Sequence, residues 1–385
     1  MALAVRLGWG ITRPSDSAAI EQLPDQREYL EVGGNLLHGH GLVMHDPRFA
    51  QPLYAYRTPG YPFLIALCDA KPLVVRCVQA LLDTSTVLAI YLLAHRWMSG
   101  GWSVAAAFLV AVNPYQIYFS GLILSETLFT AMLCWAMVLL VRRRYSFGGL
   151  LLALSILVRP SALLMPPIVV GVASLLNSEI PTPYVALRTL YVALVACVLV
   201  VIALLPWAAR NKQVLGRWTW TTTNGGITLY DGLNPNATGA SDQQFVSHMP
   251  GVSGAGEIER DRLFHQQAMD WALHNPIRVM QLAIVKIFRT WSPFPLSADF
   301  GRPLYRWIGG LWAVPFDMLV ILGLCCGRLP WPVKVFLLLP AIYLTAVHAV
   351  SVGSLRYRLP AEGPMALLAA AGIQSIVKKM SPTSA

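Results

Sequence analysis

Charged residues are scarce in this sequence. Only 12% of its 385 residues are Asp, Glu, Lys or Arg, whereas 56% are hydrophobic, and the mean hydropathy is +0.55. Soluble globular domains typically carry about 25% charged residues. The composition therefore excludes an ordinary soluble domain and predicts an all-α, polytopic membrane protein.

Several common functional motifs are absent. The sequence holds no P-loop, no dinucleotide-binding glycine fingerprint, no HExxH and no GxSxG. Their absence removes the simplest sequence support for ATP-driven transport and for the common hydrolase chemistries. The six cysteines show no metal-ligand spacing, and most lie in apolar stretches, so we interpret them as packing residues.

The net charge of +10 does not indicate nucleic-acid binding. The basic residues stand at the ends of apolar runs, where anchoring at the cytoplasmic surface explains them. No basic stripe or aromatic-interleaved module occurs, so no nucleic-acid partner is predicted.

Apolar runs predict the membrane-crossing helices. The run at residues 148–176 is interrupted by Arg159 and Pro160, and two short passes separated there keep the flanking basic residues on the cytoplasmic side. This choice predicts about nine crossings. Residues 1–11 are apolar but too short to span a bilayer, and we interpret them as the tail of an incomplete first helix. The other runs are residues 73–93, 104–119, 122–141, 190–207, 308–326, 335–352 and 359–377.

The same orientation places four segments on the outer face, namely residues 24–62, 113–125, 207–302 and 354–358. Four regions are therefore expected along the chain. They are a partial first helix with the first outer loop and a re-entrant segment at 1–72, transmembrane helices at 73–207, an outer loop region with an interfacial helix at 208–303, and C-terminal transmembrane helices at 304–385.

The outer loop region has three local patterns. TWTTTNGG predicts a strand followed by a turn, and GEIERDRLFHQQAMDWALHNP predicts an amphipathic helix that ends at Pro276. Residues 277–291 place Arg278, Lys286 and Arg289 among apolar residues, which favours a helix lying at the membrane interface over another span.

The polar segment 24–62 carries the first candidate site. If DQREYLEVGGNLL is helical, Asp25, Glu28 and Tyr29 fall within about one turn, so their polar groups converge on one side. A carboxylate cluster of this kind at a membrane surface is a candidate site.

Three histidines in that segment, His38, His40 and His45, suggest a metal site. The glycines of HGHG indicate a turn instead, and no distant partner ligand is identifiable. We therefore predict neither a metal nor a cofactor.

Five stretches of the chain form a recognisable series. They are RTPGYPFLIAL at 57–67, NPYQIYFSGLILSETLF at 113–129, GLLLALSILVRPSALLMPP at 149–167, LLPWAARN at 204–211 and SLRYRLPAEGPMALLAA at 354–370. In this order they resemble the bacterial family 39 glycosyltransferases, which are similar to protein O-mannosyltransferases and to the lipid A aminoarabinose transferase.

The resemblance implies the membrane fold called GT-C. It also implies transfer of a sugar from a polyprenyl phosphate carrier at the outer face of the membrane. An acidic residue in the first outer loop, followed closely by a tyrosine, is the catalytic base that the resemblance implies. Asp25 with Tyr29 matches that position.

The chemistry of such a transfer fits the residue types. A base must deprotonate the attacking group and cations must hold the departing phosphate, but no strong acid is needed because phosphate leaves readily as an anion. We predict Asp25 and Glu126 as the catalytic carboxylates, with Ser125 as the N-cap of the helix that carries Glu126.

A second set of residues is predicted to bind substrate. Its arginines suit bidentate hydrogen bonding to phosphate at the membrane edge. The set is Glu28, Tyr29, Arg57, Tyr61, Arg210, Arg356 and Arg358.

Structural alternatives accompany these candidates. Asp25 and Glu126 are also residues that can cap or begin a helix, and Arg57 and Arg356 can reach lipid headgroups. Arg159, which is costly inside an apolar run unless it is paired, we interpret as structural.

The sequence thus predicts a multi-pass glycosyltransferase, hexosyl or pentosyl, of the cell inner membrane, with its active site on the periplasmic or extracellular side. Its predicted partners are a polyprenyl phosphate sugar donor, a glycan, lipid or protein acceptor, and the lipid bilayer. The alternative functions are a transporter or flippase of a lipid-linked substrate, which would also use apolar grooves and outer arginines, and an inactive scaffold subunit.

Overall fold

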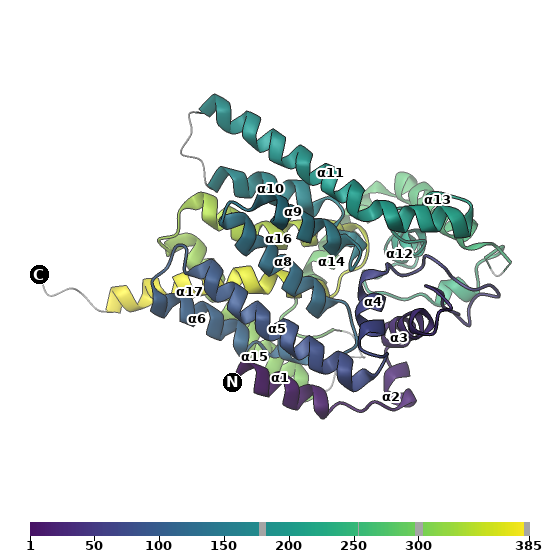
Figure 1. Ribbon diagram of the computed structural model, residues 1–385, viewed down its shortest axis with the longest axis horizontal. Coiled ribbons are helices and arrows are strands. Elements are labelled where there is room, and N and C mark those ends of the chain that lie inside the picture. Colours follow the sequence, from purple (N-terminus) through teal and green to yellow (C-terminus); the bar gives the residue numbers. More distant parts are fainter. Residues whose placement is uncertain (177–181, 253, 297–302, 381–385) are drawn as a thin grey trace, which may run out of the picture.

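The computed structural model describes residues 1–176, 182–252, 254–296 and 303–380. Apart from one bridge between Met44 and Leu53, the regular secondary structure in these ranges is helical. Long helices lie roughly side by side as a bundle, and shorter helices gather at one end of it (Figure 1).

The bundle supplies most of the chain's length. Its helices are α1 (Ala2–Ile11), α5 (Pro72–Ala94), α6 (Gly100–Ala111), α8 (Glu126–Val141), α9 (Tyr145–Ile156), α10 (Met165–Leu176), α11 (Thr182–Leu215), α15 (Pro303–Cys326), α16 (Trp331–Val350) and α17 (Leu359–Met380). The helices at the end of the bundle are α2 (Ser17–Glu21), α3 (Pro24–Leu37), α4 (Gly60–Leu67), α12 (Gly225–Gly232) and α13 (Glu257–His274). The remaining elements include α7 (Pro114–Ser120), α14 (Pro276–Thr290) and the short 3₁₀ turns η1 (Pro160–Ala162) and η4 (Leu355–Tyr357).

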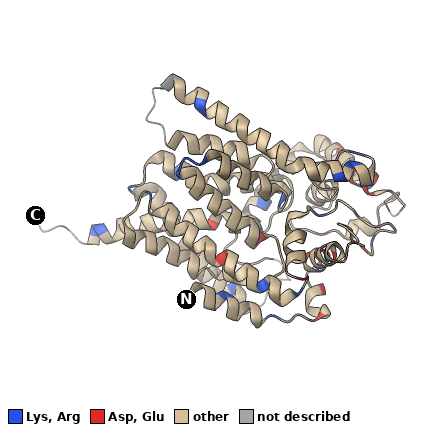
Figure 2. Cartoon of the chain, viewed as in Figure 1, with Lys and Arg blue, Asp and Glu red and all other residues tan. Residues whose placement is uncertain are grey.

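Within the described residues, four helices are long and apolar enough to cross a membrane, and further apolar helices are shorter than this. Few charges interrupt the bundle (Figure 2). The chain is therefore a multi-pass membrane protein, whereas its number of crossings and the division into four regions stay predictions. The four long helices are Pro72–Ala94, Tyr184–Leu215, Pro303–Cys326 and Trp331–Val350.

The break predicted in the run 148–176 is present. α9 ends at Ile156 and α10 begins at Met165, with η1 between them. Arg159 is extended at φ −140° and ψ 106°, as expected for a residue that precedes a proline. The break therefore follows from Pro160.

The run 104–119 was predicted as one helix, and this is wrong. α6 ends at Ala111, and α7 begins at Pro114. The side chain of Asn113 accepts hydrogen bonds from the backbone N–H groups of Tyr115 and Gln116, which caps α7 and starts a new helix.

The strand predicted in TWTTTNGG is also absent. Two of its carbonyls bind side chains of α11: the Thr219 carbonyl accepts from Asn211 and the Thr221 carbonyl accepts from Trp207. The Thr223 N–H donates to the Ala55 carbonyl of the first loop. Because side chains satisfy these carbonyls, the segment needs no strand partner. The amphipathic helix predicted in the outer loop region is confirmed as α13, and the predicted segment 277–291 forms α14, which ends at Thr290.

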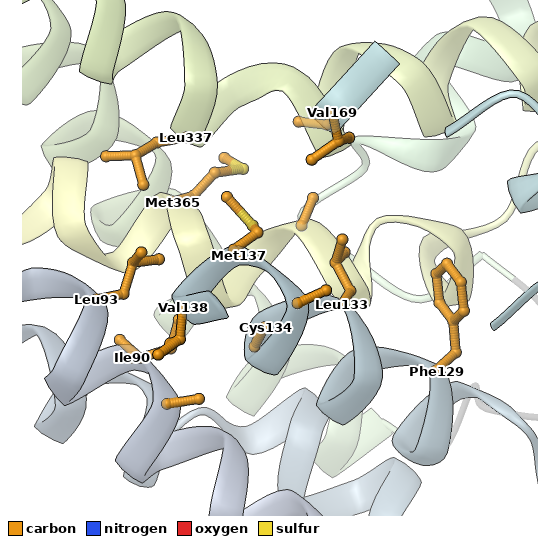
Figure 3. Close-up of a cluster of buried hydrophobic side chains, with 14 of the residues drawn as sticks. Ile90, Leu93, Phe129, Leu133, Cys134, Met137, Val138, Val169, Leu337 and Met365 are labelled. Atoms are coloured by element: carbon orange, nitrogen blue, oxygen red, sulfur yellow. The ribbon is translucent and has the colours of Figure 1, made fainter. Parts of the chain in front are cut away.

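The core of the bundle surrounds α17, whose residues from Leu359 to Gly372 are all buried. A Cβ on Gly323 would lie 1.8 Å from the carbonyl oxygen of Leu368, so glycine at this position lets α15 approach the backbone of α17. Met137 of α8 and Met365 of α17 lie together in the surrounding apolar cluster (Figure 3). This packing fixes the start of α17, and therefore η4 immediately before it.

Candidate active site

Helix α3 carries the first part of the site. Pro24 occupies the first helical position, where its missing N–H costs nothing, and Asp25 lies in the first turn. Positions 25, 28 and 29 share one side of the helix, as the sequence predicts. The Glu28 and Tyr29 side chains are buried, while the Asp25 side chain remains 27% exposed.

Arg57 bridges two of the carboxylates of α3, Asp25 and Glu28. Its Nε donates to Glu28 Oε2 at 2.7 Å, and its Nη2 donates to Asp25 Oδ1. The turn that follows Arg57 is held against the break between α9 and α10, because Gly60 donates its N–H to the Leu157 carbonyl at 2.8 Å. A Cβ on Gly60 would lie 2.7 Å from that oxygen, so the contact requires glycine.

Arg356, in η4, joins the α3 carboxylate to α8. Its Nη1 donates to Asp25 Oδ2 at 2.8 Å and its Nε donates to Glu126 Oε1 at 2.5 Å. Glu126 is 1% exposed and also forms an ion pair with Arg159, whose Nη1 lies 3.0 Å from Oε1. These contacts link residues from five separate parts of the chain into one charge network, which consists of Asp25, Glu28, Glu126, Arg57, Arg159 and Arg356.

The network shifts the pKa values of Asp25 and Glu28 in opposite directions. Burial raises the pKa of Asp25, but Arg57 and Arg356 outweigh it, so the pKa lies below its ordinary value. Burial raises the pKa of Glu28 above its ordinary value, because it outweighs the contact with Arg57. Asp25, which meets two guanidinium groups and is the more exposed, is therefore the carboxylate that stays ionised most readily.

Aromatic side chains pack against the charge network. The Tyr29 ring packs edge-on against Tyr61 with centroids 4.8 Å apart, and the Tyr29 hydroxyl donates to Ser125 Oγ at 3.4 Å. Tyr61 is fully buried and donates to Gln79 Oε1 at 2.5 Å. Ser125 is the N-cap residue of α8, as predicted, but its backbone is already helical and its side chain makes no capping hydrogen bond.

Two predicted arginines lie in other settings. Arg210 donates to the backbone carbonyls of Tyr54 at 2.6 Å and Leu42 at 2.8 Å, so it ties the first loop to α11. Arg358 is buried, and its Nε donates to Glu362 Oε1 at 2.8 Å. Both side chains are therefore committed to structural contacts outside the charge network.

The histidines of the first loop do not converge. His38 Nδ1 lies 2.7 Å from the Gly34 carbonyl, and His45 Nδ1 lies 3.3 Å from Glu31 Oε1. Across the described ranges no three His, Cys, Asp or Glu side chains group as ligands of one metal ion would.

The structure adds residues that the candidate set omitted. Arg159 belongs to the charge network, and Tyr357 stacks on His348 with centroids 3.7 Å apart and an interplanar angle of 1°. The Arg159 guanidinium lies 5.5 Å from the centre of the Tyr357 ring. A charge beside a proline in an apolar run was the available signal for Arg159; nothing in the sequence links His348 to Tyr357.

A pocket opens beside Arg356. It encloses about 680 Å³ of empty space, part of it open to solvent. Aromatic and aliphatic side chains supply most of its lining, and Arg289 and Arg356 supply its positive charge. The lining residues are Pro114, Tyr115, Tyr118, Phe119, Arg289, Pro295, Leu296, Tyr305, Ile308, Gly309, Gly353, Ser354, Leu355 and Arg356.

Comparison with known proteins identifies the fold. No family model matches the chain, and no curated protein matches it. Among solved structures, the chain is similar to the Archaeoglobus fulgidus oligosaccharyltransferase in complex with Zn and sulfate, with a TM-score of 0.55 and 16% identity over 98% of this chain. The apo form of that protein gives a TM-score of 0.52 and 15% identity over 98% of this chain.

The chain has the GT-C fold. It spans about half the length of these relatives, covering 49% and 50% of their chains. A likeness at this identity establishes the arrangement of the helices, which agrees with the prediction from the sequence, and leaves the family 39 resemblance a prediction.

Proposed function

We propose that this protein is a glycosyltransferase of the bacterial family 39 type. It transfers a hexose or pentose from a polyprenyl phosphate carrier to a glycan, lipid or protein acceptor. The observation that carries this proposal is the position of Asp25, a partly exposed carboxylate held by Arg57 and Arg356. Arg356 also lines the apolar pocket. The proposed base, the phosphate-binding cation and the lipid-binding pocket are therefore adjacent.

The proposed reaction assigns a role to each of these groups. An oxygen of the acceptor attacks the anomeric carbon of the sugar while the bond from that carbon to the phosphate oxygen breaks. The bonding electrons leave with the phosphate, which Arg356 receives, and the acceptor proton passes to Asp25. The prenyl chain occupies the pocket beside Arg356, which is lined by side chains such as Tyr118, Phe119 and Ile308.

The two arginines also explain how a strongly ionised carboxylate acts as a base. Without substrate, Arg57 and Arg356 hold the pKa of Asp25 low. A bound phosphate competes for Arg356 and brings its own negative charge near Asp25, and both effects raise the proton affinity of the carboxylate. Asp25 thereby becomes a better base when the donor is bound.

Other features support the same proposal. The structural relative with the TM-score of 0.55 is an oligosaccharyltransferase, so the fold is known to accommodate sugar transfer. Basic residues flanking the apolar runs favour an inner-membrane protein with the charge network on the periplasmic or extracellular side. Glu126 fixes Arg356 and Arg159 in the site, and is proposed as its second catalytic carboxylate.

The test is transfer of a radiolabelled sugar from membrane polyprenyl phosphate lipids to endogenous acceptors, in membranes with and without the protein. Labelled acceptor should form only when the protein is present. Equal transfer without the protein, together with build-up of the lipid-linked sugar on one face, would contradict the proposal and favour a flippase.

A further inference from the structure

Arg289 is a second cation in the pocket beside Arg356. It lies near the end of α14, whereas Arg356 lies in η4. Both side chains line the pocket, and no Asp or Glu is among the lining residues. The pocket therefore has positive charge from two directions and no carboxylate in its described wall.

The two arginines differ in what they already contact. Arg356 is bound to Asp25 and Glu126. The Nε of Arg289 is buried and finds no hydrogen-bond partner among the described residues. Burial lowers the pKa of the Arg289 guanidinium, and no carboxylate within the described ranges counteracts this effect. Lys286, one turn earlier, instead donates to the Val350 carbonyl at 2.8 Å.

A buried guanidinium nitrogen without a hydrogen-bond partner is costly unless a ligand supplies one. The ligand that suits this pocket has an anionic group for the guanidinium and an apolar body for the aromatic and aliphatic wall. Arginine offers a planar fork of donors that matches phosphate oxygens. An isoprenyl phosphate has both parts.

We propose that Arg289 binds the phosphate of the lipid donor, opposite Arg356. This inference rests on the proposed function and adds to it a substrate-binding residue from a separate element. With Arg289 and Arg356 on the phosphate, Arg57 remains on the α3 carboxylates and keeps Asp25 in place. Arg289 is thus a residue for donor recognition, and Asp25 is the residue for proton transfer.

The experiment measures binding by the purified full-length protein in nanodiscs. The probes are a short isoprenyl monophosphate and the isoprenol of the same chain length. The variants are Arg289→Gln and Arg289→Lys. Arg278→Gln is the matched control, because Arg278 lies on the same helix but outside the pocket and near its exposed start.

The expected result is that Arg289→Gln weakens monophosphate binding about ten- to hundredfold, as for the loss of a hydrogen bond to a charged group. Isoprenol binding should not change, Arg289→Lys should recover part of the affinity, and Arg278→Gln should bind like the native protein. Unchanged monophosphate affinity in Arg289→Gln would overturn this inference and leave the proposed function intact. A native protein that binds monophosphate no better than isoprenol would overturn both.

Discussion

Replacing Glu126 by glutamine should destabilise the protein strongly. The carboxylate is 1% exposed and holds Arg356 at 2.5 Å and Arg159 at 3.0 Å. Glutamine keeps the shape of the side chain but removes its charge, so two largely buried guanidinium groups lose a counter-ion. Breaking a buried ion pair from one side costs about 3–5 kcal/mol, and we expect a loss of this size in Glu126→Gln.

The assay is thermal unfolding in one detergent, followed by tryptophan fluorescence. Glu31→Gln is the control, because that carboxylate is 28% exposed and its partner His45 lies at 3.3 Å; an exposed pair contributes less than about 1 kcal/mol. Removing Arg159 as well should cost less than the sum of the single changes, since one unpaired charge disappears. If Glu126→Gln unfolds no earlier than Glu31→Gln, the interpretation of the charge network is wrong.

Three further predictions concern the surroundings of the site. Gly60→Ala forces a methyl group onto the Leu157 carbonyl and should cost about 1–3 kcal/mol in thermal unfolding, whereas Gly100→Ala, with open space, should cost little. The raised pKa of Glu28 means that its stabilising effect is complete below its ordinary value of 4.5 and is lost as pH rises through the folded-state pKa. The unfolding temperature of the native protein should therefore decrease relative to that of Glu28→Gln as pH rises above 4.5, and parallel curves would contradict this. Arg210→Gln should lower stability by about 1.5–3 kcal/mol through its lost backbone contacts, yet leave isoprenyl monophosphate affinity unchanged in the nanodisc assay.

The spacing of residues in the sequence was sufficient to predict which side chains converge where these side chains lie on one helix. Asp25, Glu28 and Tyr29 converge because three- and four-residue intervals share a helix face. The break at Pro160 was equally readable, since proline prevents a continuous helix. The apolar runs likewise predicted the positions of the bundle helices. The exception is the run 104–119, in which Asn113 caps the start of a second helix.

The ion pairs and hydrogen bonds between segments far apart in the chain could not be predicted from spacing. Arg356 and Arg358 are two residues apart, yet the first binds Asp25 and the second binds Glu362, because their short 3₁₀ turn directs them to different sides. Arg210 stands at a predicted membrane edge, like Arg57 and Arg356, but it donates its hydrogen bonds to backbone carbonyls of the first loop. Such partners depend on tertiary packing, which residue type and spacing do not determine.

The most direct test of the central claim is sugar transfer by Asp25→Asn, measured beside isoprenyl monophosphate binding and compared with Glu31→Gln at equal amounts in the membrane. Asparagine keeps the shape of the side chain but cannot take the acceptor proton. We predict that transfer falls on the order of a hundredfold or more, while monophosphate binding persists and Glu31→Gln behaves like the native protein. Transfer at the native rate by Asp25→Asn would contradict the assignment of Asp25 as the base.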